Sequence, residues 1–127
     1  MDEVLEIADI VKEYPSQIST DKQTMELVMR DMLAQAPTNK YGLIFGSHGS
    51  SWLNTIYTSR SFGQDGSKTD NTILLSEITD VLNTLGKTFE FILFDACYMG
   101  TIEVCHEFRN ISNYLIVSAM EVPAYGF

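Results

Sequence analysis

Two patterns of apolar and polar positions alternate along the chain. Three short runs are apolar almost throughout, which is typical of strands buried in a parallel sheet that is covered on both faces. These runs are YGLIF at 41–45, FEFILF at 89–94 and YLIVSA at 114–119. Apolar residues elsewhere recur every three or four positions, which indicates amphipathic helices. We expect helices from Thr20 to near Pro37, over 73–85 and over 101–108.

The first helix has a marked start. Thr20 with Gln23 three positions later forms a capping-box pattern, and Asp21 suits the positive end of a helix. Residues Met25, Val28, Met29 and Met32 fall on one face, and we expect the three methionines to belong to the core. Gly86 is placed to end the second helix.

The segment before the first helix fits two structures. In VLEIADIVKEYP the apolar spacing fits a helical face, while the part before Pro15 also fits a short strand. We favour a strand over 10–14. Residues 46–70 hold four glycines and show little periodicity, a pattern typical of a functional or mobile loop.

The order of these elements predicts the fold class. Strands that alternate with helices form βαβ units, so we expect one α/β domain over 1–127 with a mainly parallel sheet. The chain has 127 residues, 45% of them hydrophobic, which is enough for an ordinary core.

Charge and composition narrow the possible partners. The net charge of −9 argues against nucleic acid and anionic membranes, and it suits a cationic substrate or partner. No run of eighteen apolar residues exists, and the first residues, MDEVLE, are acidic. We therefore expect the chain as given to be soluble, without an export signal. Its two cysteines, Cys97 and Cys105, match neither a disulfide scaffold nor a zinc site.

Two reactive side chains directly follow predicted strands. His48, with Gly49, closes YGLIFGSHG, and Cys97 closes FILFDAC. Ligands bind at the carboxyl ends of parallel strands, so neighbouring strands would bring the imidazole and the thiol together. Gly46 and Gly49 would let the backbone turn and leave the imidazole open to approach. The alternative interpretation is that Cys97 is a small buried residue and His48 an ordinary surface residue.

The joint pattern carries a resemblance. The segments YGLIFGSHGSSWL, SRSFGQDGS, FEFILFDACYMGTIEV and YLIVSAMEVPAYGF are similar to the clostripain family of cysteine peptidases, relatives of caspases, gingipains and legumain. The separation of His48 and Cys97, about fifty residues, also fits caspases. The resemblance implies a caspase-like three-layer sandwich in which Cys97 is the nucleophile and His48 the general base or acid. The backbone amides of Gly49 and Cys97 would form the oxyanion site.

The same resemblance implies specificity for Arg or Lys before the scissile bond. An acidic residue two positions before the nucleophile lines the family's specificity pocket, and Asp95 stands there. The alternative is that Asp95 caps the helix after Cys97. Glu121 would add a second carboxylate to this rim, and Trp52 would wall the substrate cleft.

Relatives mature by self-cleavage after a basic residue between the histidine and the cysteine. Arg60 is the first candidate and Lys68 the second. Family members normally have a further strand before this region and a longer C-terminal part, so we expect this chain to lack both. A remaining segment of the same precursor would be its partner, and the whole protein would be secreted or periplasmic.

A second function class stays open. The chain would then be an inactive fragment or a non-catalytic relative that binds basic peptides or a partner protein. We expect no cofactor, although calcium is possible because some relatives bind it; Asp65 and Asp70 are acidic but lack a calcium-loop spacing. On the third helix we expect His106 at the surface and Cys105 in the core.

Overall fold

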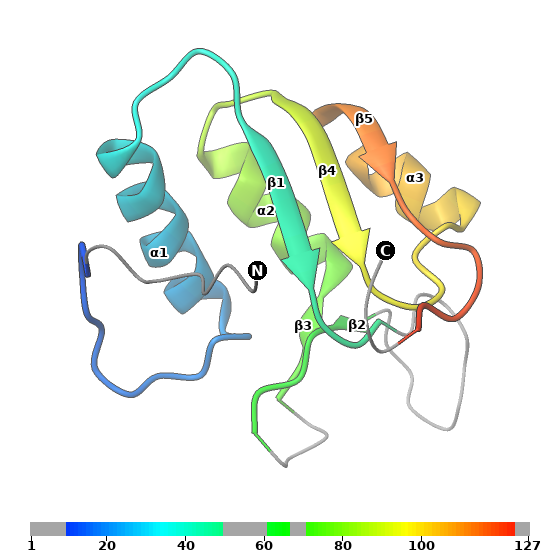
Figure 1. The fold of residues 1–127 in the computed structure, drawn as a ribbon, viewed down its shortest axis with the longest axis horizontal. Helices are drawn as coiled ribbons and strands as arrows, with labels where there is room; N and C mark the ends of the chain where they lie inside the picture. The colour runs from blue at the N-terminus through cyan, green and yellow to red at the C-terminus, as the bar shows by residue number, and fades with distance from the viewer. Residues whose placement is uncertain (1–9, 50–60, 67–70, 124–127) are drawn as a thin grey trace, which may run out of the picture.

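The computed structural model describes residues 10–49, 61–66 and 71–123. Three helices and five strands follow one another in these described residues (Figure 1). In chain order they are α1 (Lys22–Gln35), β1 (Gly42–Gly46), β2 (Ser61–Phe62), β3 (Ile73–Leu74), α2 (Leu75–Thr84), β4 (Phe89–Asp95), α3 (Ile102–Phe108) and β5 (Ser112–Ile116). In the described part of the chain, no helix is long and apolar enough to cross a membrane.

The main sheet is parallel, with strand order β1-β4-β5. β4 is therefore the central strand, and its register places Phe45 opposite Phe94 and Gly46 opposite Asp95. The short strands β2 and β3 form a separate antiparallel pair. The predicted α/β class with a mainly parallel sheet is confirmed.

Aromatic packing between the sheet and the helices forms the centre of the core. The Phe94 ring stacks on Phe45 at 5.1 Å between centroids, and its edge contacts reach Phe62 at 5.4 Å and Phe108 at 5.2 Å. Phe108 belongs to α3, which lies with α2 behind the sheet in the view of Figure 1. The Phe94 side chain of β4 thus contacts the neighbouring strand β1, the strand β2 and the helix α3.

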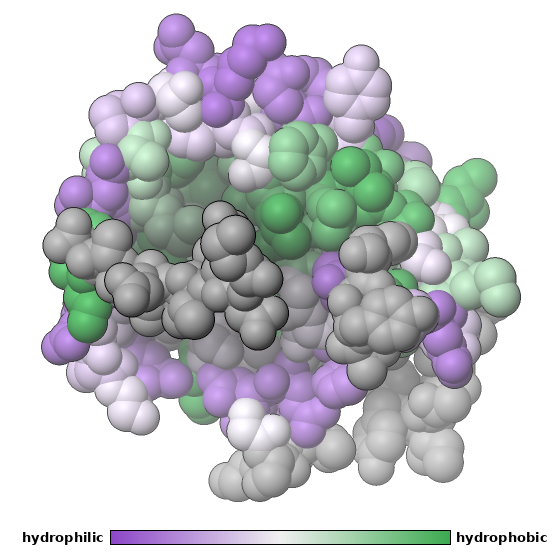
Figure 2. Space-filling view, in the orientation of Figure 1, coloured by the Kyte–Doolittle hydropathy of each residue, from purple (hydrophilic) through white to green (hydrophobic). Residues whose placement is uncertain are grey.

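The opposite face of the sheet is not covered by any helix of the described residues. Ile44 is 67% exposed, Tyr114 71% and Ile116 44%, and all three lie on this face. Figure 2 shows hydrophobic residues gathered over the sheet on that side. The prediction that the 41–45 strand is covered on both faces was wrong for this reason. The described residues supply two of the three layers of the expected sandwich.

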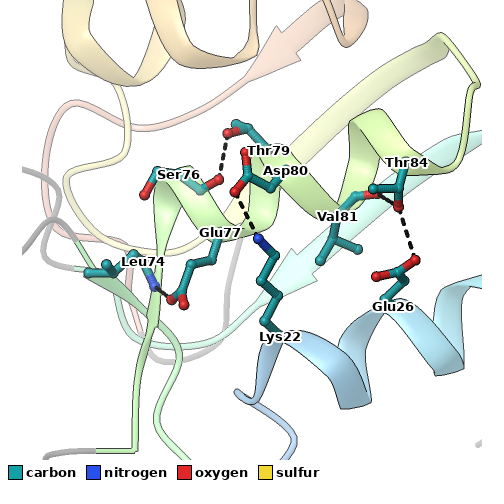
Figure 3. Close-up of polar contacts among 9 residues, drawn as sticks. All are labelled: Lys22, Glu26, Leu74, Ser76, Glu77, Thr79, Asp80, Val81 and Thr84. Atoms are coloured by element: carbon teal, nitrogen blue, oxygen red, sulfur yellow. Dashed lines mark hydrogen bonds and ion pairs between the residues drawn. The ribbon is translucent and has the colours of Figure 1, made fainter.

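Polar side-chain contacts join the helix α1 to α2. Lys22 Nζ lies 2.8 Å from Asp80 Oδ2, and the Thr84 hydroxyl donates to the Glu26 carboxylate at 3.3 Å (Figure 3). No residue of α1 is fully buried. Met25 and Met29 pack against the core, but Met32 is 58% exposed, so the prediction that it is a core residue was wrong.

Two predicted features at the start of the chain differ in the structure. The cap of α1 is Asp21, whose carboxylate accepts a hydrogen bond from Thr24 N–H at 2.9 Å, because the helix begins one residue later than a Thr20 cap requires. No strand forms over 10–14. That segment is instead attached to α1 by side chains, since Tyr14 and Lys12 both donate to the Asp31 carboxylate and lower its pKa.

The other predicted helix boundaries agree closely with the structure. Gly86, with φ of 62°, follows the end of α2 in the left-handed conformation that glycine tolerates. At the start of α2, the Glu77 carboxylate accepts the Leu74 N–H at 3.0 Å (Figure 3). Thr101 caps α3 by accepting the Val104 N–H.

The two faces of the sheet predict a contrast in stability between matched substitutions. Ile92→Ala removes a completely buried side chain from β4 and is expected to lower the free energy of unfolding by about 2–5 kcal/mol. Ile44→Ala makes the same chemical change on the exposed face of β1 and should cost about 1 kcal/mol or less. Urea unfolding of both variants measures the difference. A similar loss in both would mean that a further layer covers Ile44.

Candidate active site

The carboxyl ends of the parallel strands border one cleft of about 550 Å³. His48 comes from the segment after β1, and Asp95 and Cys97 come from the end of β4. The remaining lining residues are Gly46, Ser47, Gln64, Ala96, Val122 and Pro123. The structure therefore brings the predicted imidazole, thiol and pocket carboxylate to the same cleft.

The register of β1 on β4 explains this meeting. Gly46 is paired with Asp95, and the next backbone contact, from Ser47 N–H to the Asp95 carbonyl at 3.3 Å, continues the pairing past the strand end. His48 and Cys97 each stand two residues beyond this last pair. Two residues that leave equivalent positions of adjacent parallel strands emerge at the same rim.

Gly49 lets the His48 segment lie directly against the Cys97 segment. A Cβ atom at Gly49 would stand 2.7 Å from the Cys97 carbonyl oxygen, 3.0 Å from Met99 Sδ and 3.1 Å from Ala96 Cβ. The first of these contacts is to backbone, so no side-chain rotation relieves it. The close approach, more than backbone flexibility, is why glycine is needed here.

The segment after β5 forms the third side of the site. Tyr98 N–H donates to the Met120 carbonyl at 3.0 Å, and Gly100 N–H donates to the Ser118 carbonyl at 2.7 Å. Tyr98 itself has φ of 59°, an uncommon conformation for a residue other than glycine. Backbone bonds thus attach the loop that carries Cys97 to residues 118–122.

Cys97 and Asp95 are both only partly buried. The Cys97 sulfur lies 3.4 Å from the Val122 amide nitrogen and 3.9 Å from the Val122 carbonyl oxygen. Among the residues that the structure describes, no hydrogen bond or ion pair engages the Asp95 carboxylate, and α3 is capped by Thr101 instead. The alternative interpretation of Asp95 as a helix cap is therefore wrong, and the residue lines the cleft.

Glu121 is exposed and lies next to the site without lining the cleft. Its carboxylate accepts a hydrogen bond from the Tyr98 phenol at 2.8 Å. This hydrogen bond raises the pKa of Tyr98, because the proton of the phenol is shared with a carboxylate. A role of Glu121 in substrate binding stays a prediction.

Other predicted residues fall away from the cleft or outside the described residues. Cys105 is exposed on α3, so its prediction as a core residue was wrong; the inward positions of this short helix are Val104 and Phe108. His106 is exposed, as expected. Three further predicted residues, Trp52, Arg60 and Lys68, lie outside the described residues.

The described part of the chain contains no cluster of side chains that would bind the calcium ion considered from the sequence. No group of three His, Cys, Asp or Glu side chains placed to hold a metal ion occurs there. The Asp65 carboxylate accepts the Ser19 N–H, which lowers the pKa of Asp65 and explains its place in the fold. Asp70 lies outside the described residues.

Sequence reasoning did not identify Gln64, Val122 or Pro123 as cleft residues. None of them carries a catalytic group; Gln64 follows β2, and Val122 and Pro123 follow β5, which runs parallel to β4 and ends at the same rim. For Val122 and Pro123, the one feature of the sequence that could have predicted their place is that they follow the 114–119 strand, whose end was expected at the same rim.

Comparison with known proteins assigns the family. The model of the clostripain family matches residues 1–127, and the chain belongs to that family. It is similar to a secreted C11 cysteine protease from Bacteroides thetaiotaomicron, solved with an irreversible peptide inhibitor: 36% identity over 93% of this chain, with a TM-score of 0.82. A search of curated protein sequences found no significant match.

Two further structures agree. A second structure of a secreted C11 cysteine protease from Bacteroides thetaiotaomicron, "iotapain", shares 29% identity over 85% of this chain with a TM-score of 0.73. An inactive zymogen C11 protease from Parabacteroides distasonis shares 35% identity over 92% of this chain, with a TM-score of 0.67. The chain spans about one third of the length of these proteins, 33%, 33% and 32% respectively.

The contact at Gly49 predicts an effect of adding one methyl group. Gly49→Ala must push the His48 segment away from Cys97, and we expect a loss of about 1–3 kcal/mol in the free energy of unfolding. Gly46→Ala is the matched control, because a Cβ atom there meets nothing within 4 Å. Urea unfolding compares the two. Equal stability of the two variants would show that the two segments are not in close contact.

Proposed function

We propose that the protein is a cysteine endopeptidase that cleaves after Arg or Lys. The observation that carries this proposal is the common cleft of His48, Asp95 and Cys97 at the carboxyl ends of β1 and β4. Membership of a peptidase family supports the reaction class. The geometry supports the pairing of a base with a thiol and of a carboxylate with a basic side chain.

In this proposal Cys97 and His48 act as a dyad. The imidazole of His48 takes the proton of the Cys97 thiol, and the thiolate attacks the carbonyl carbon of the scissile bond. When the intermediate collapses, the imidazolium gives its proton to the leaving amine and an acyl-enzyme remains. Water activated by His48 then hydrolyses the thioester and restores the thiol.

The backbone around Gly49 and Cys97 would stabilise the oxyanion. The two residues are in contact, because a Cβ atom at Gly49 would reach the Cys97 carbonyl oxygen at 2.7 Å. Gly49 also forms a β-bridge with Phe62. The hydrogen bond at this bridge runs from the Gly63 N–H to the His48 carbonyl at 2.9 Å, so it does not use the Gly49 N–H. Amides of Gly49 and Cys97 that point to one substrate oxygen would supply fixed dipoles where negative charge develops.

Asp95 would bind the basic side chain of the substrate through an ion pair. Its carboxylate is half-buried in the cleft, where a guanidinium or ammonium needs a charged partner. The net charge of −9 would also attract cationic peptides. Trp52 and Glu121 are proposed as further substrate contacts. The calcium ion proposed at Asp65 and Asp70 would not take part in the dyad chemistry.

A second candidate is a chain that is inactive by itself. The exposed sheet face with Ile44, Tyr114 and Ile116 favours it, as does the span of about one third of the matched structures. A further segment of the same precursor that covers this face would complete the enzyme. By analogy with the secreted Bacteroides thetaiotaomicron protease, we propose that the whole protein is secreted or periplasmic.

The charge of Asp95 gives a specific test of the proposed function. The chain, expressed with any flanking sequence that its gene encodes, should hydrolyse a fluorogenic peptidyl-arginine substrate and lose this activity in Cys97→Ala. Asp95→Asn removes one charge at constant shape and should lower kcat/KM for arginine about 10- to 100-fold, the range for a hydrogen bond to a charged group. Peptidyl-citrulline is the matched control, since it lacks the charge that Asp95 would bind.

Outcomes of this experiment separate the candidates. Equal losses on arginine and citrulline substrates in Asp95→Asn would refute charge recognition by Asp95. Absence of turnover together with absence of an arginyl chloromethylketone adduct on Cys97 by mass spectrometry would refute the peptidase proposal and favour a non-catalytic chain that binds basic peptides.

Self-processing at Arg60 gives a prediction on chain length. The active protein should be cut between Arg60 and Ser61, whereas Cys97→Ala and Arg60→Ala should each remain one chain. Because β1 and β4 pair in the main sheet, the two pieces should still elute together from a sizing column without denaturant. Intact mass and N-terminal sequencing of the pieces identify the cut. A cut that survives Arg60→Ala and disappears in Lys68→Ala would assign processing to Lys68.

A further inference from the structure

The Cys97 sulfur has a backbone partner besides the imidazole expected from the proposed dyad. The Val122 N–H donates to Sγ at 3.4 Å, an ordinary distance for a sulfur acceptor. The thiol proton can in turn point to the Val122 carbonyl oxygen, but at 3.9 Å that contact is at the limit for a hydrogen bond to sulfur. The two contacts respond oppositely when the thiol ionises.

Ionisation strengthens the shorter contact and removes the longer one. A thiolate has no proton to give the carbonyl, whereas an amide N–H that donates to an anion forms a charge-assisted hydrogen bond. A hydrogen bond made to the charged form of a group favours that form. Val122 thus presents the nucleophile with a donor that is worth more after deprotonation.

The Val122 amide is held in place by bonds between residues 118–122 and the loop after Cys97. Tyr98 N–H donates to the Met120 carbonyl at 3.0 Å, and the Tyr98 phenol donates to the Glu121 carboxylate at 2.8 Å. Tyr98 follows the nucleophile directly and Glu121 directly precedes Val122. The strained φ of 59° at Tyr98 is the conformation in which both bonds form.

We propose that the Val122 backbone amide stabilises the Cys97 thiolate, and that Tyr98 and Glu121 are positioning residues that hold this amide against the sulfur. The inference rests on the proposed function in one respect, the role of Cys97 as nucleophile. The charged and titratable groups near Cys97 in the described residues are His48 and Asp95, which line the same cleft, and Tyr98 with Glu121 beside it. By sharing its proton with Glu121, Tyr98 also screens that carboxylate from the thiolate.

The proposal is tested by the reactivity of the thiol, independently of peptide hydrolysis. Iodoacetamide alkylation of Cys97 is followed between about pH 6, where an ordinary thiol is protonated, and about pH 10, where it is ionised. Cys105 is exposed and would also react, so all proteins carry Cys105→Ser. Val122→Pro removes the N–H, and Val122→Ala is its reference because it loses the side chain but keeps the N–H.

We expect Val122→Pro to react about tenfold more slowly than Val122→Ala near pH 6, the scale of a hydrogen bond to a charged group, and at the same rate near pH 10. Tyr98→Phe keeps the ring and loses only the hydroxyl group that donates to Glu121, and should slow the reaction near pH 6 about fivefold. Glu121→Gln retains an acceptor for the phenol and should restore most of the rate that a Glu121→Ala variant loses. Thermal unfolding checks each variant, and Tyr98→Phe decides the outcome where Val122→Pro does not fold.

Two results would overturn the inference. One is an equal rate for the proline and alanine variants near pH 6, and the other is a loss of rate that is the same at both pH values, which indicates a structural or access effect. Because alkylation needs no substrate, the inference can fail while arginine substrates are still hydrolysed. Conversely, a chain with no peptidase activity that shows the expected pH profile would support the thiolate contact and refute the proposed function alone.

Discussion

The stacking of Phe45 on Phe94 is the contact on which the rest of the structure depends. These rings pack at 5.1 Å across the β1–β4 pair, and Phe62 and Phe108 close around them. The next residues in each strand, Gly46 and Asp95, begin the cleft. A slip of one residue between the strands would shift one side of the cleft by about 3.3 Å and separate the groups of the proposed dyad.

Backbone contacts between three chain segments build the rim of the cleft. Gly49 allows direct contact between the first two strand ends, and the bonds from Tyr98 and Gly100 attach the segment after β5. None of these contacts involves the reactive side chains themselves. Positions that permit backbone approach therefore determine where the thiol, the imidazole and the carboxylate can lie, and the proposed catalysis would need this precision.

The sequence predicted elements better than it predicted their surroundings. The strands β1, β4 and β5 and the helices α2 and α3 were expected near their observed places, because apolar runs and periodic faces record local burial. The short strands β2 and β3 were not predicted: the first lies in the stretch expected to be irregular, and the second was assigned to the start of a helix. Met32 and Ile44 were expected to be covered and are not, since a single apolar side chain cannot reveal whether another layer packs on it. The segment 10–14 has strand-like composition, but a strand needs a partner backbone, and side-chain bonds to α1 decide its position instead.

By itself, the sequence determined the α/β class and the segments that form the main strands. It also placed His48, Asp95 and Cys97 just after apolar runs. Each of these features depends on neighbours in the chain. Only the tertiary structure decided that Val122 approaches the Cys97 sulfur, that Glu121 binds the Tyr98 phenol and that Asp95 faces the cleft without capping α3. These contacts join residues separated by 23 or more positions or select among local alternatives. They depend on which strands pair and in which register, which no local pattern specifies.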